Sequence, residues 1–428
     1  MPDLVRRATR RGFWPMVDQA VVSIGNFLTV IVVARGLQDK NDYGMFGVIL
    51  EFMFFLNNFQ SGLITYPLTV KGAVVDEQGL KRLTMASTML TILLGLPLII
   101  ITLIVGGAIG KLALGSTAAT AVVIWQIKET SRRGLWAHFR HKDSILGDAI
   151  SYLGQALGVW ILWRLGNLTL VNVFGVMAMT HMLAAIVQAI QIGVAPVAMR
   201  DLPQIMRDFW KTGRWVALTT LSSIAGSVCG SWALWLFHSG SQVADFFAIG
   251  NLLKLCNPVL SSIGGLITPA AAARYAQAGM REAKRTAFRY AMLGLAMLAP
   301  YLLFIVIVPA VAMKVTYGSN THFLGQENAL RGCAIGYFFI FAIGAMTAFL
   351  NGVHKARYAF FGQLSASILQ FVTVLPLNIM FGLNGYVWGG VMLASIQLLI
   401  LGWFMHKAMN EPAEVETGEA DELAPAIS

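Results

Sequence analysis

GMFGVILEFMFFLNNFQSGLITYP, residues 44–67, is the stretch that decides the fold. Most of it is an apolar run of the kind that crosses a bilayer as a helix, which needs about 20 residues. The same segment nevertheless carries Glu51, Asn58 and Ser61. Polar groups in hydrocarbon are costly unless they meet partners or water. These side chains therefore predict a polar site inside the membrane rather than a lipid-facing surface.

The composition of the whole chain is that of a membrane protein. Hydrophobic residues make up 57% of the 428 positions and charged residues only 12%, whereas a soluble domain carries roughly 25% charge. Apolar runs long enough to cross a bilayer recur along almost the whole length. They predict an all-α polytopic membrane protein with twelve transmembrane helices at residues 14–34, 44–68, 83–106, 114–134, 145–163, 170–192, 214–237, 245–268, 287–311, 331–353, 358–379 and 385–405.

The distribution of charge predicts the orientation. If the N-terminus lies inside, 24 of the 31 Lys and Arg residues fall in inside segments, 6 in outside segments or span ends, and Lys254 within a span. This bias follows the positive-inside rule and predicts that both termini are cytoplasmic. It also accounts for the net charge of +10 without a nucleic-acid partner. The first apolar run is too long for a cleaved signal, so we expect a retained helix.

A shift of the sequence by 203 residues reveals an internal repeat. Residues 42–68 then align with residues 245–271 at seven identical positions out of 27, including GLIT at 62–65 and 265–268. We expect Gly62 and Gly265 in these tetrapeptides to allow close helix approach. The shift carries the second span onto the eighth, and six spans per half give both halves the same orientation.

The repeat therefore predicts two six-helix lobes related by a parallel pseudo-two-fold axis, with a central cleft between them. The predicted parts are an N-terminal lobe at 1–195, a cytoplasmic connection at 196–213, a C-terminal lobe at 214–409 and an acidic disordered tail at 410–428.

Polar residues recur at helical steps of three and four in the first two spans of each half. Such residues can simply join helices at about 1 kcal/mol each, or they can line a water-filled cleft. We favour the cleft because the stripes form two repeat-related pairs. The candidate lining residues are Gln19, Ser23, Asn26, Glu51, Asn58, Ser61, Asn251, Lys254 and Ser261.

The repeat also aligns Glu51 with Lys254. Ionisable residues inside spans are functional candidates by default. Three roles fit this pair: an outer gate that closes when the cleft faces inward, a substrate site in which Lys254 binds an anion and Glu51 orients the lysine, or a static ion pair that fixes helix packing.

Other ionisable residues within spans have simpler interpretations. Asp18 either binds a proton or cation for coupling, a role also open to Glu51, or contacts nearby inside arginines. We expect Asp148 to be a charge at a helix start, His181 to be a satisfied interior histidine, and Arg35 to snorkel at an outer span end.

We expect no catalytic activity, metal or cofactor. The sequence contains no HExxH, GxSxG, Walker or CxxC motif. The longest predicted outside loop, residues 314–326, is too short for a catalytic domain. This length also argues against a membrane glycan polymerase or ligase.

Two stretches resemble the polysaccharide (O-antigen) flippases of the multidrug/oligosaccharidyl-lipid/polysaccharide exporter superfamily. The first is FWPMVDQAVVSIGNFLTVIVVARGL at 13–37 followed by DYGMFGVIL at 42–50, with Ala-Arg-Gly-Leu at 34–37 and Asp-Tyr-Gly at 42–44. The second is the basic connection KETSRRGLWAHFRHKDSILGDAISYLGQ at 128–155. The resemblance covers the whole chain in span count and the first 160 residues in local pattern.

The resemblance implies a flippase of the bacterial cytoplasmic membrane. It would move undecaprenyl-pyrophosphate-linked oligosaccharide from the inner to the outer leaflet by alternating access, in surface polysaccharide biosynthesis. Glycosyltransferases and a glycan polymerase would be its partners. Lys254, helped by Arg35, would attract the phosphates. The alternative is a cation-coupled multidrug or metabolite antiporter of the same superfamily, which would depend on the acids.

Overall fold

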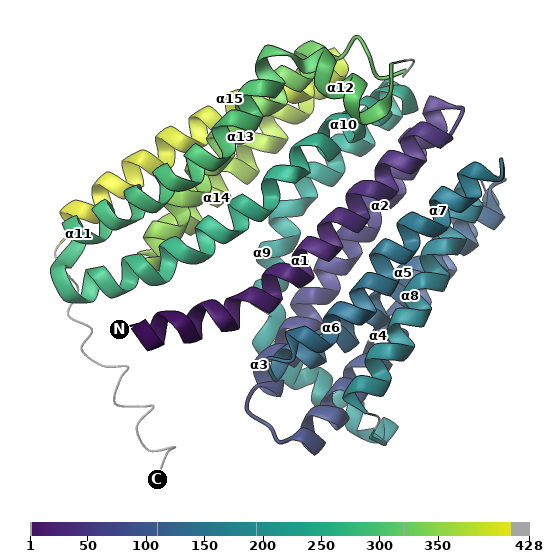
Figure 1. Cartoon of the computed structure of the whole chain (residues 1–428), viewed down its shortest axis with the longest axis horizontal. Coiled ribbons are helices and arrows are strands. Elements are labelled where there is room, and N and C mark those ends of the chain that lie inside the picture. The colour runs from purple at the N-terminus through teal and green to yellow at the C-terminus, as the bar shows by residue number, and fades with distance from the viewer. Residues whose placement is uncertain (1, 109, 194, 320–321, 412–428) are drawn as a thin grey trace.

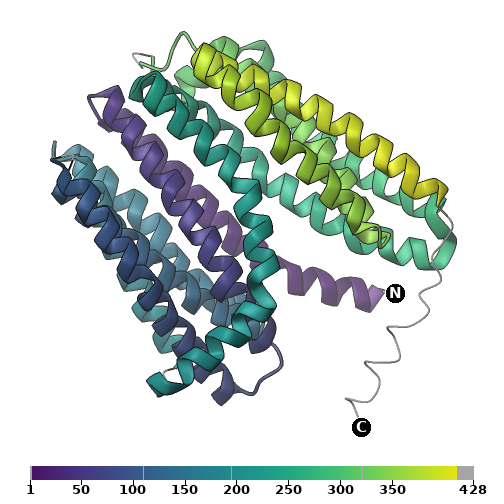
Figure 2. The same cartoon turned by 180° about the vertical axis from the view of Figure 1, so that it is seen from behind.

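The structure is a computed structural model that describes residues 2–108, 110–193, 195–319 and 322–411. Every regular element in these residues is a helix or a helical turn. The helices form two groups that meet at one end and diverge toward the other (Figures 1 and 2). We call these groups the N-lobe and the C-lobe. The prediction of an all-α polytopic membrane protein is confirmed.

The N-lobe contains the chain up to residue 192. Its elements are α1 (Pro2–Gly36), α2 (Lys40–Gln60), η1 (Ser61–Thr65), α3 (Tyr66–Gly72), α4 (Glu77–Ala108), α5 (Leu112–Ala137), α6 (His141–Asp148), η2 (Ala149–Leu153), α7 (Gly154–Arg164) and α8 (Leu170–Ile192).

The C-lobe is formed by most of the chain from residue 199, although residues 202–217 still pack against the N-lobe in an apolar cluster with Leu63 and Ile64. Its elements are η3 (Met199–Asp201), α9 (Leu202–Phe237), α10 (Gly240–Leu253), η4 (Lys254–Cys256), α11 (Asn257–Ile307), α12 (Pro309–Tyr317), α13 (Glu327–Gly352), α14 (Ala356–Leu369), η5 (Gln370–Val374) and α15 (Leu375–Asn410). Much of the predicted connection at 196–213 is therefore the beginning of α9.

Eight stretches of the described chain are long and apolar enough to cross a membrane. Two of them, Gly240–Ile307 and Ala356–Asn410, have 68 and 55 residues, several times the roughly 20 that one crossing needs. The backbone leaves helical geometry inside each, at Gly279 (φ 75°) and Gly382 (φ 60°), angles that glycine adopts at little cost. The protein is thus multi-pass, and the count of twelve spans stays a prediction.

The stretch quoted at the outset folds as α2 followed by a widened helical turn. SGLIT forms the π-helical turn η1, whereas the second GLIT lies in regular α-helix within α11. The sequence repeat is therefore not a repeat of local backbone. A Cβ atom at Gly62 would lie 2.4 Å from the Cα of Ala217 in α9, so close packing here is confirmed. The matching prediction for Gly265 is wrong, because a Cβ there meets no described atom within 4 Å.

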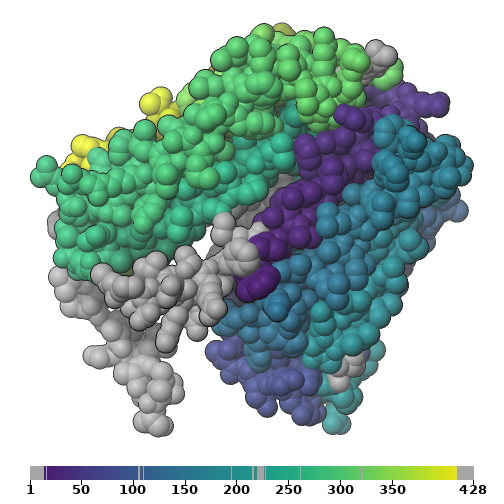
Figure 3. Space-filling view, in the orientation of Figure 1, coloured from purple at the N-terminus to yellow at the C-terminus, as the bar shows by residue number. Residues whose placement is uncertain are grey.

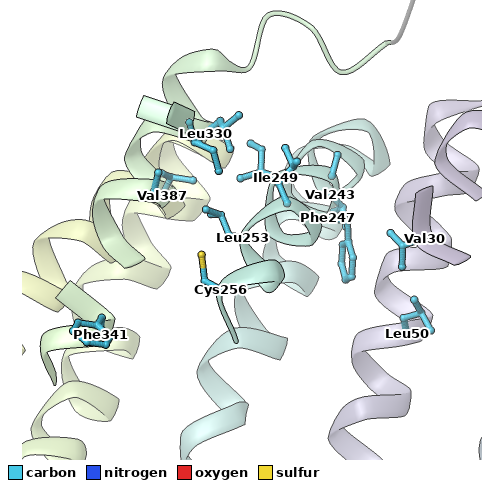
Figure 4. Close-up of a cluster of buried hydrophobic side chains, with 14 of the residues drawn as sticks. Val30, Leu50, Val243, Phe247, Ile249, Leu253, Cys256, Leu330, Phe341 and Val387 are labelled. Carbon is cyan, nitrogen blue, oxygen red and sulfur yellow. The ribbon is translucent and has the colours of Figure 1, made fainter. Parts of the chain in front are cut away.

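An apolar core joins the lobes at the end where they meet. Val30 and Leu50 of the N-lobe face α10, which contributes Val243 and Phe247, and the same cluster continues to Val387 of α15 (Figure 4). This packing holds one end of the two lobes together, and α9 passes between the lobes, with Ala217 packed against Gly62 of η1.

The C-terminal tail begins with an anchored residue. The carboxylate of Glu411 accepts hydrogen bonds from Tyr358, from Lys355 Nζ (3.1 Å) and from Arg357 Nη2 (2.9 Å). The rest of the predicted disordered tail, residues 412–428, lies outside the described residues.

Candidate functional site

The meeting end of the lobes is closed by polar contacts, which we call the end seal: Arg35, Lys40, Tyr43, Asp245 and Phe323. Lys40 Nζ of α2 lies 2.6 Å from Asp245 of α10. The Arg35 guanidinium donates to the carbonyl oxygens of Thr316 (2.6 and 2.9 Å) and Val315 (3.0 Å) in α12. The Tyr43 and Phe323 rings meet edge to face, with centroids 5.3 Å apart.

Glycines bring the backbones together beneath the end seal. A Cβ atom at Gly44 would lie 2.0 Å from the carbonyl oxygen of Gly240, and one at Gly47 would lie 2.3 Å from the Phe247 ring. No side chain fits at either position unless α2 and α10 move apart. The Asp-Tyr-Gly turn at 42–44 thus has a structural cause in this chain.

The lobes separate toward the opposite end, where a hollow opens between them (Figure 3). α1 borders the hollow. On α1, Asp18 and Gly25 are buried against the N-lobe, whereas Gln19 is exposed and Ser23 and Asn26 are half-buried. The polar stripe predicted on this helix therefore lies away from the packed core.

The predicted polar stripe of α2 continues beside this hollow. Asn58 and Ser61 are half-buried. Asn58 Nδ2 donates to the carbonyl of Phe54 in its own helix (2.8 Å), and Thr65 donates to the Ser61 hydroxyl (3.3 Å). Both side chains are thus satisfied locally and still reach the surface of the N-lobe.

Glu51 and Lys254 line one cavity, from different lobes. Lys254 lies in η4, where the helix tightens to 3-10 geometry ahead of Pro258. Its side chain is exposed, with Nζ 5.8 Å from the ring centroids of both Phe54 and Phe247. Among the described residues no carboxylate oxygen lies within 4.0 Å of this ammonium.

Glu51 does not form the static ion pair that was one of its three predicted roles. Its carboxylate hydrogen-bonds with Ser231 of α9, and its Oε2 atom is buried without a hydrogen-bond partner in the described structure. An outer gate at this pair is also absent from this conformation, because the lobes are closed by the end seal instead. The role as a substrate site remains a prediction.

Three predicted site residues have other surroundings. Asn251 is buried beside Tyr317, inside the C-lobe rather than on the hollow. Arg35 is exposed and belongs to the end seal, and its snorkelling and its contact with phosphates both stay predictions. The side chain of Ser261 lies outside the described residues.

The N-lobe encloses a cluster of buried charges that we call the ionic network: Asp18, Lys128, Glu129, Arg132 and Asp148. Arg132 reaches three carboxylates, with Nη2 2.5 Å from Asp18, Nη1 3.2 Å from Glu129 and Nε 2.6 Å from Asp148. Lys128 also pairs with Asp148 and lies 3.8 Å from Glu129. All five side chains are buried.

The ionic network shows one of the two interpretations of Asp18, and its role in ion coupling stays a prediction. The predicted contact with an inside arginine is present, and Ser144 also donates to the Asp18 carboxylate (3.1 Å). Asp148 is the last residue of α6, fully buried, so its assignment to a helix start is wrong. His181 is buried and bonded to Ser151, which confirms the interior histidine.

The sequence interpretation missed the basic half of this network. Lys128 and Arg132 were counted as part of a cytoplasmic connection, but they lie in the last three turns of α5, which continues to Ala137. A signal was present: residues 128 and 132, spaced i and i+4, share one face of a helix, and Glu129 lies beside them.

Known proteins resemble this chain in structure and not in sequence. No protein-family model matches, and no curated protein is similar in sequence. A multidrug resistance MATE family transporter of the MOP superfamily in an inward-facing conformation superposes with a TM-score of 0.77 at 13% identity, over 92% of this chain and 97% of that chain.

Two further structures extend the likeness. A MATE family transporter in an outward-facing conformation gives a TM-score of 0.61 at 15% identity, over 94% of this chain and 96% of that chain. The lipid II flippase MurJ in an inward closed conformation gives a TM-score of 0.70 at 12% identity, over 91% of this chain and 87% of that chain. The chain therefore has the polytopic all-α fold of MOP superfamily transporters. Multidrug transporters and a lipid flippase both share this fold.

Proposed function

We propose that this protein is a flippase that moves a lipid-linked oligosaccharide from the inner to the outer leaflet by alternating access, for surface polysaccharide biosynthesis in the bacterial cytoplasmic membrane. The observation that carries the proposal is Lys254, an exposed cation in a cavity that Glu51 of the other lobe also lines, in a fold whose lobes are closed at one end by the end seal. The better superposition on an inward-facing transporter (0.77) than on an outward-facing one (0.61) agrees with this shape.

The chemistry of the cleft favours an anionic substrate. An ammonium without a carboxylate partner attracts phosphate, and the low dielectric of the surroundings strengthens that attraction. The buried acids Asp18 and Asp148 are already paired with Lys128 and Arg132. The polar residues on α1 and α2 would solvate the sugars of an undecaprenyl-pyrophosphate-linked glycan.

Alternating access requires the end seal to open. The lobes would then rotate apart at Lys40 and Asp245 and close across the present hollow. Ion flux through Asp18 or Glu51 would drive this exchange, and for Asp18 it would require the pair with Arg132 to loosen. Glycosyltransferases would supply the substrate and a glycan polymerase would use it outside.

Depletion of the protein tests this proposal in cells. We expect lipid-linked glycan to accumulate on the inner leaflet, where externally added glycan-modifying enzymes do not reach it. Normal export of surface polysaccharide without the protein would contradict the proposal.

A cation-coupled multidrug or metabolite antiporter is the second candidate. It is favoured by the likeness to multidrug transporters and by the unpartnered Oε2 atom of Glu51. The two candidates differ in which variant fails. A flippase needs Lys254, whereas a cation exporter tolerates Lys254→Ala and fails with Asp18→Asn.

A further inference from the structure

The C-lobe contains a cavity of about 430 Å³, which we call the C-lobe cavity. This volume lies within the range of roughly 300–1,000 Å³ that is typical of small-molecule sites. Its walls come from α10, α13, η5 and α15, and the residues of α2 and η4 that reach it are Glu51 and Lys254. Both lobes thus contribute a charged residue to this cavity.

Glycines create the free space in this cavity. Gly250 and Gly390 both line it, and a Cβ atom at either position would meet no described atom within 4 Å. Elsewhere in the fold, a neighbouring helix occupies the space where a Cβ atom would lie, as at Gly44 and Gly62. Gly250 and Gly390 face empty space instead, which a ligand can occupy, whereas Gly332, which also lines the cavity, packs against Val387.

The lining is mostly apolar with a few polar groups. Phe247, Leu253, Val387 and other aliphatic residues form most of the wall, and Figure 4 shows these three on α10 and α15. Polar atoms come from Tyr337 and Gln370 among others. Such a surface suits an apolar group with few hydrogen bonds, because unpaired polar groups in it are costly.

The π-helical turns of the two lobes have different surroundings. Among the described residues the N-lobe has two π-helical turns, η1 and η2, and the C-lobe has one, η5. Such turns occur frequently at functional sites. Tyr152 of η2 packs against the ionic network, with Lys128 Nζ 4.6 Å from its ring centroid. Gln370 and Val374 of η5 line the C-lobe cavity instead.

We propose that the C-lobe cavity binds the apolar arm of an amphiphilic anion whose acid group is held by Lys254. The ammonium supplies the charge, the Phe54 and Phe247 ring centroids lie 5.8 Å from it, and the cavity takes the arm. The inference rests on the proposed function, because it assigns the chemical class and the position of what the cleft binds. It also places part of the ligand inside protein rather than in lipid.

Equilibrium binding to the purified full-length protein tests the inference directly. The protein is placed in phosphatidylcholine nanodiscs and titrated with tritiated farnesyl phosphate, read by scintillation proximity. We expect saturable binding that Lys254→Gln weakens about tenfold or more, as expected for the loss of a charged hydrogen-bonding group. Gly390→Leu should weaken it at least as much by filling the cavity.

Gly344→Leu is the matched control for the cavity-filling variant. Gly344 is also a helical glycine with no described atom within 4 Å of a Cβ, but it does not line the cavity. It should bind the probe like the unmodified protein. Equal binding by Gly390→Leu and the unmodified protein would overturn the inference, as would farnesol binding as tightly as farnesyl phosphate.

Cys333 gives a second measurement that does not depend on a cavity-filling variant. This cysteine lines the C-lobe cavity. In a Cys229→Ser/Cys256→Ala background, a small methanethiosulfonate reagent should modify it, and farnesyl phosphate should slow the reaction at least about fivefold, as a ligand near saturation does. Unchanged modification at saturating probe would count against the site.

Competing ligands identify the source of the anion and separate the two proposals. Displacement by 1-naphthyl phosphate supports the site and points to compact organic anions, whereas displacement by longer prenyl phosphates alone supports it and points to a lipid headgroup. Inorganic phosphate competing as well as either would overturn the role of the apolar arm. If the protein binds farnesyl phosphate but transports no glycan, the inference stands and the proposed function fails. If it transports the glycan but does not bind farnesyl phosphate, only the inference fails.

Discussion

Lys40 at the start of α2 and Asp245 of α10 form an ion pair of 2.6 Å that joins the two lobes at their closed end. Asp245 is nearly fully buried and also accepts a hydrogen bond from Gln326 (3.0 Å). Eleven residues separate Lys40 from Glu51, which is about 16 Å along a helix. The lobes are therefore closed well beyond the Glu51 and Lys254 pair, for which a gate was one of three predicted roles.

Weakening the Lys40–Asp245 pair should open the closed end. Breaking a buried pair leaves an uncompensated charge and costs about 3–5 kcal/mol, so Asp245→Asn should shift the protein toward an outward-open conformation. A single cysteine introduced at Phe323, in a background without native cysteines, should then react faster with a membrane-impermeant maleimide.

The charge-reversed pair is the control for this prediction. The double variant Lys40→Asp/Asp245→Lys restores an ion pair and should bring the labelling rate back toward that of the parent. If Asp245→Asn and the double variant react with the maleimide at the same rate, the Lys40–Asp245 pair does not hold the end seal closed.

Gly62 and Gly265 offer a matched test of the sequence repeat. Valine at 62 would collide with Ala217 of α9, and overpacking of this kind costs about 1–3 kcal/mol. Valine at 265 meets open space. We expect Gly62→Val to lower the temperature of thermal unfolding in detergent clearly more than Gly265→Val does. Equal shifts would mean that the close approach at Gly62 carries no energy.

The ionic network should be a large stabilising element of the N-lobe. Arg132→Met leaves Asp18 and Asp148 buried without their shared partner, and we expect a loss of about 3–5 kcal/mol in the free energy of unfolding. Arg133, one-third exposed and paired with Glu129 at 3.1 Å, is the control, because exposed pairs contribute about 0–1 kcal/mol. Similar losses for Arg132→Met and Arg133→Met would refute a buried network.

The attachment of the C-terminus should depend on pH. Hydrogen bonds from Tyr358, Lys355 and Arg357 lower the pKa of Glu411 from its ordinary value of 4.5 to about 2. A lowered pKa means that the contact stabilises the folded end above pH 4.5 and loses this effect as the pH falls toward 2. Glu411→Gln should therefore raise the rate of backbone amide hydrogen exchange at the end of α15 at neutral pH. A rate equal to that of the unmodified protein would show that the contact is unimportant.

The sequence predicted what depends on apolar periodicity. Long apolar runs form α-helices in a membrane, because a helix satisfies its own backbone hydrogen bonds. The all-α polytopic class followed from this. The prediction of close helix approach held at Gly62 and failed at Gly265, so the shared tetrapeptide alone did not determine the packing.

The contacts between distant charges could not be predicted in the same way. Lys128 and Arg132 lie near the end of a span, where basic residues ordinarily meet water, and only the fold shows that Asp18 and Asp148 face them. The sequence leaves the partner of Lys40 open in the same way. A charge at a span end is consistent with solvent or with a partner more than 200 residues away, and local pattern does not distinguish the two.

Transport by the purified protein tests the central claim most directly. Proteoliposomes would carry undecaprenyl-pyrophosphate linked to a fluorescent oligosaccharide, and an impermeant quencher would report its leaflet. We predict that the unmodified protein moves the lipid across the bilayer and that Lys254→Ala, folded to the same melting temperature, slows this movement about tenfold or more. Movement unaffected by Lys254→Ala, or no movement of this lipid alongside cation-driven efflux of a drug, would contradict the account.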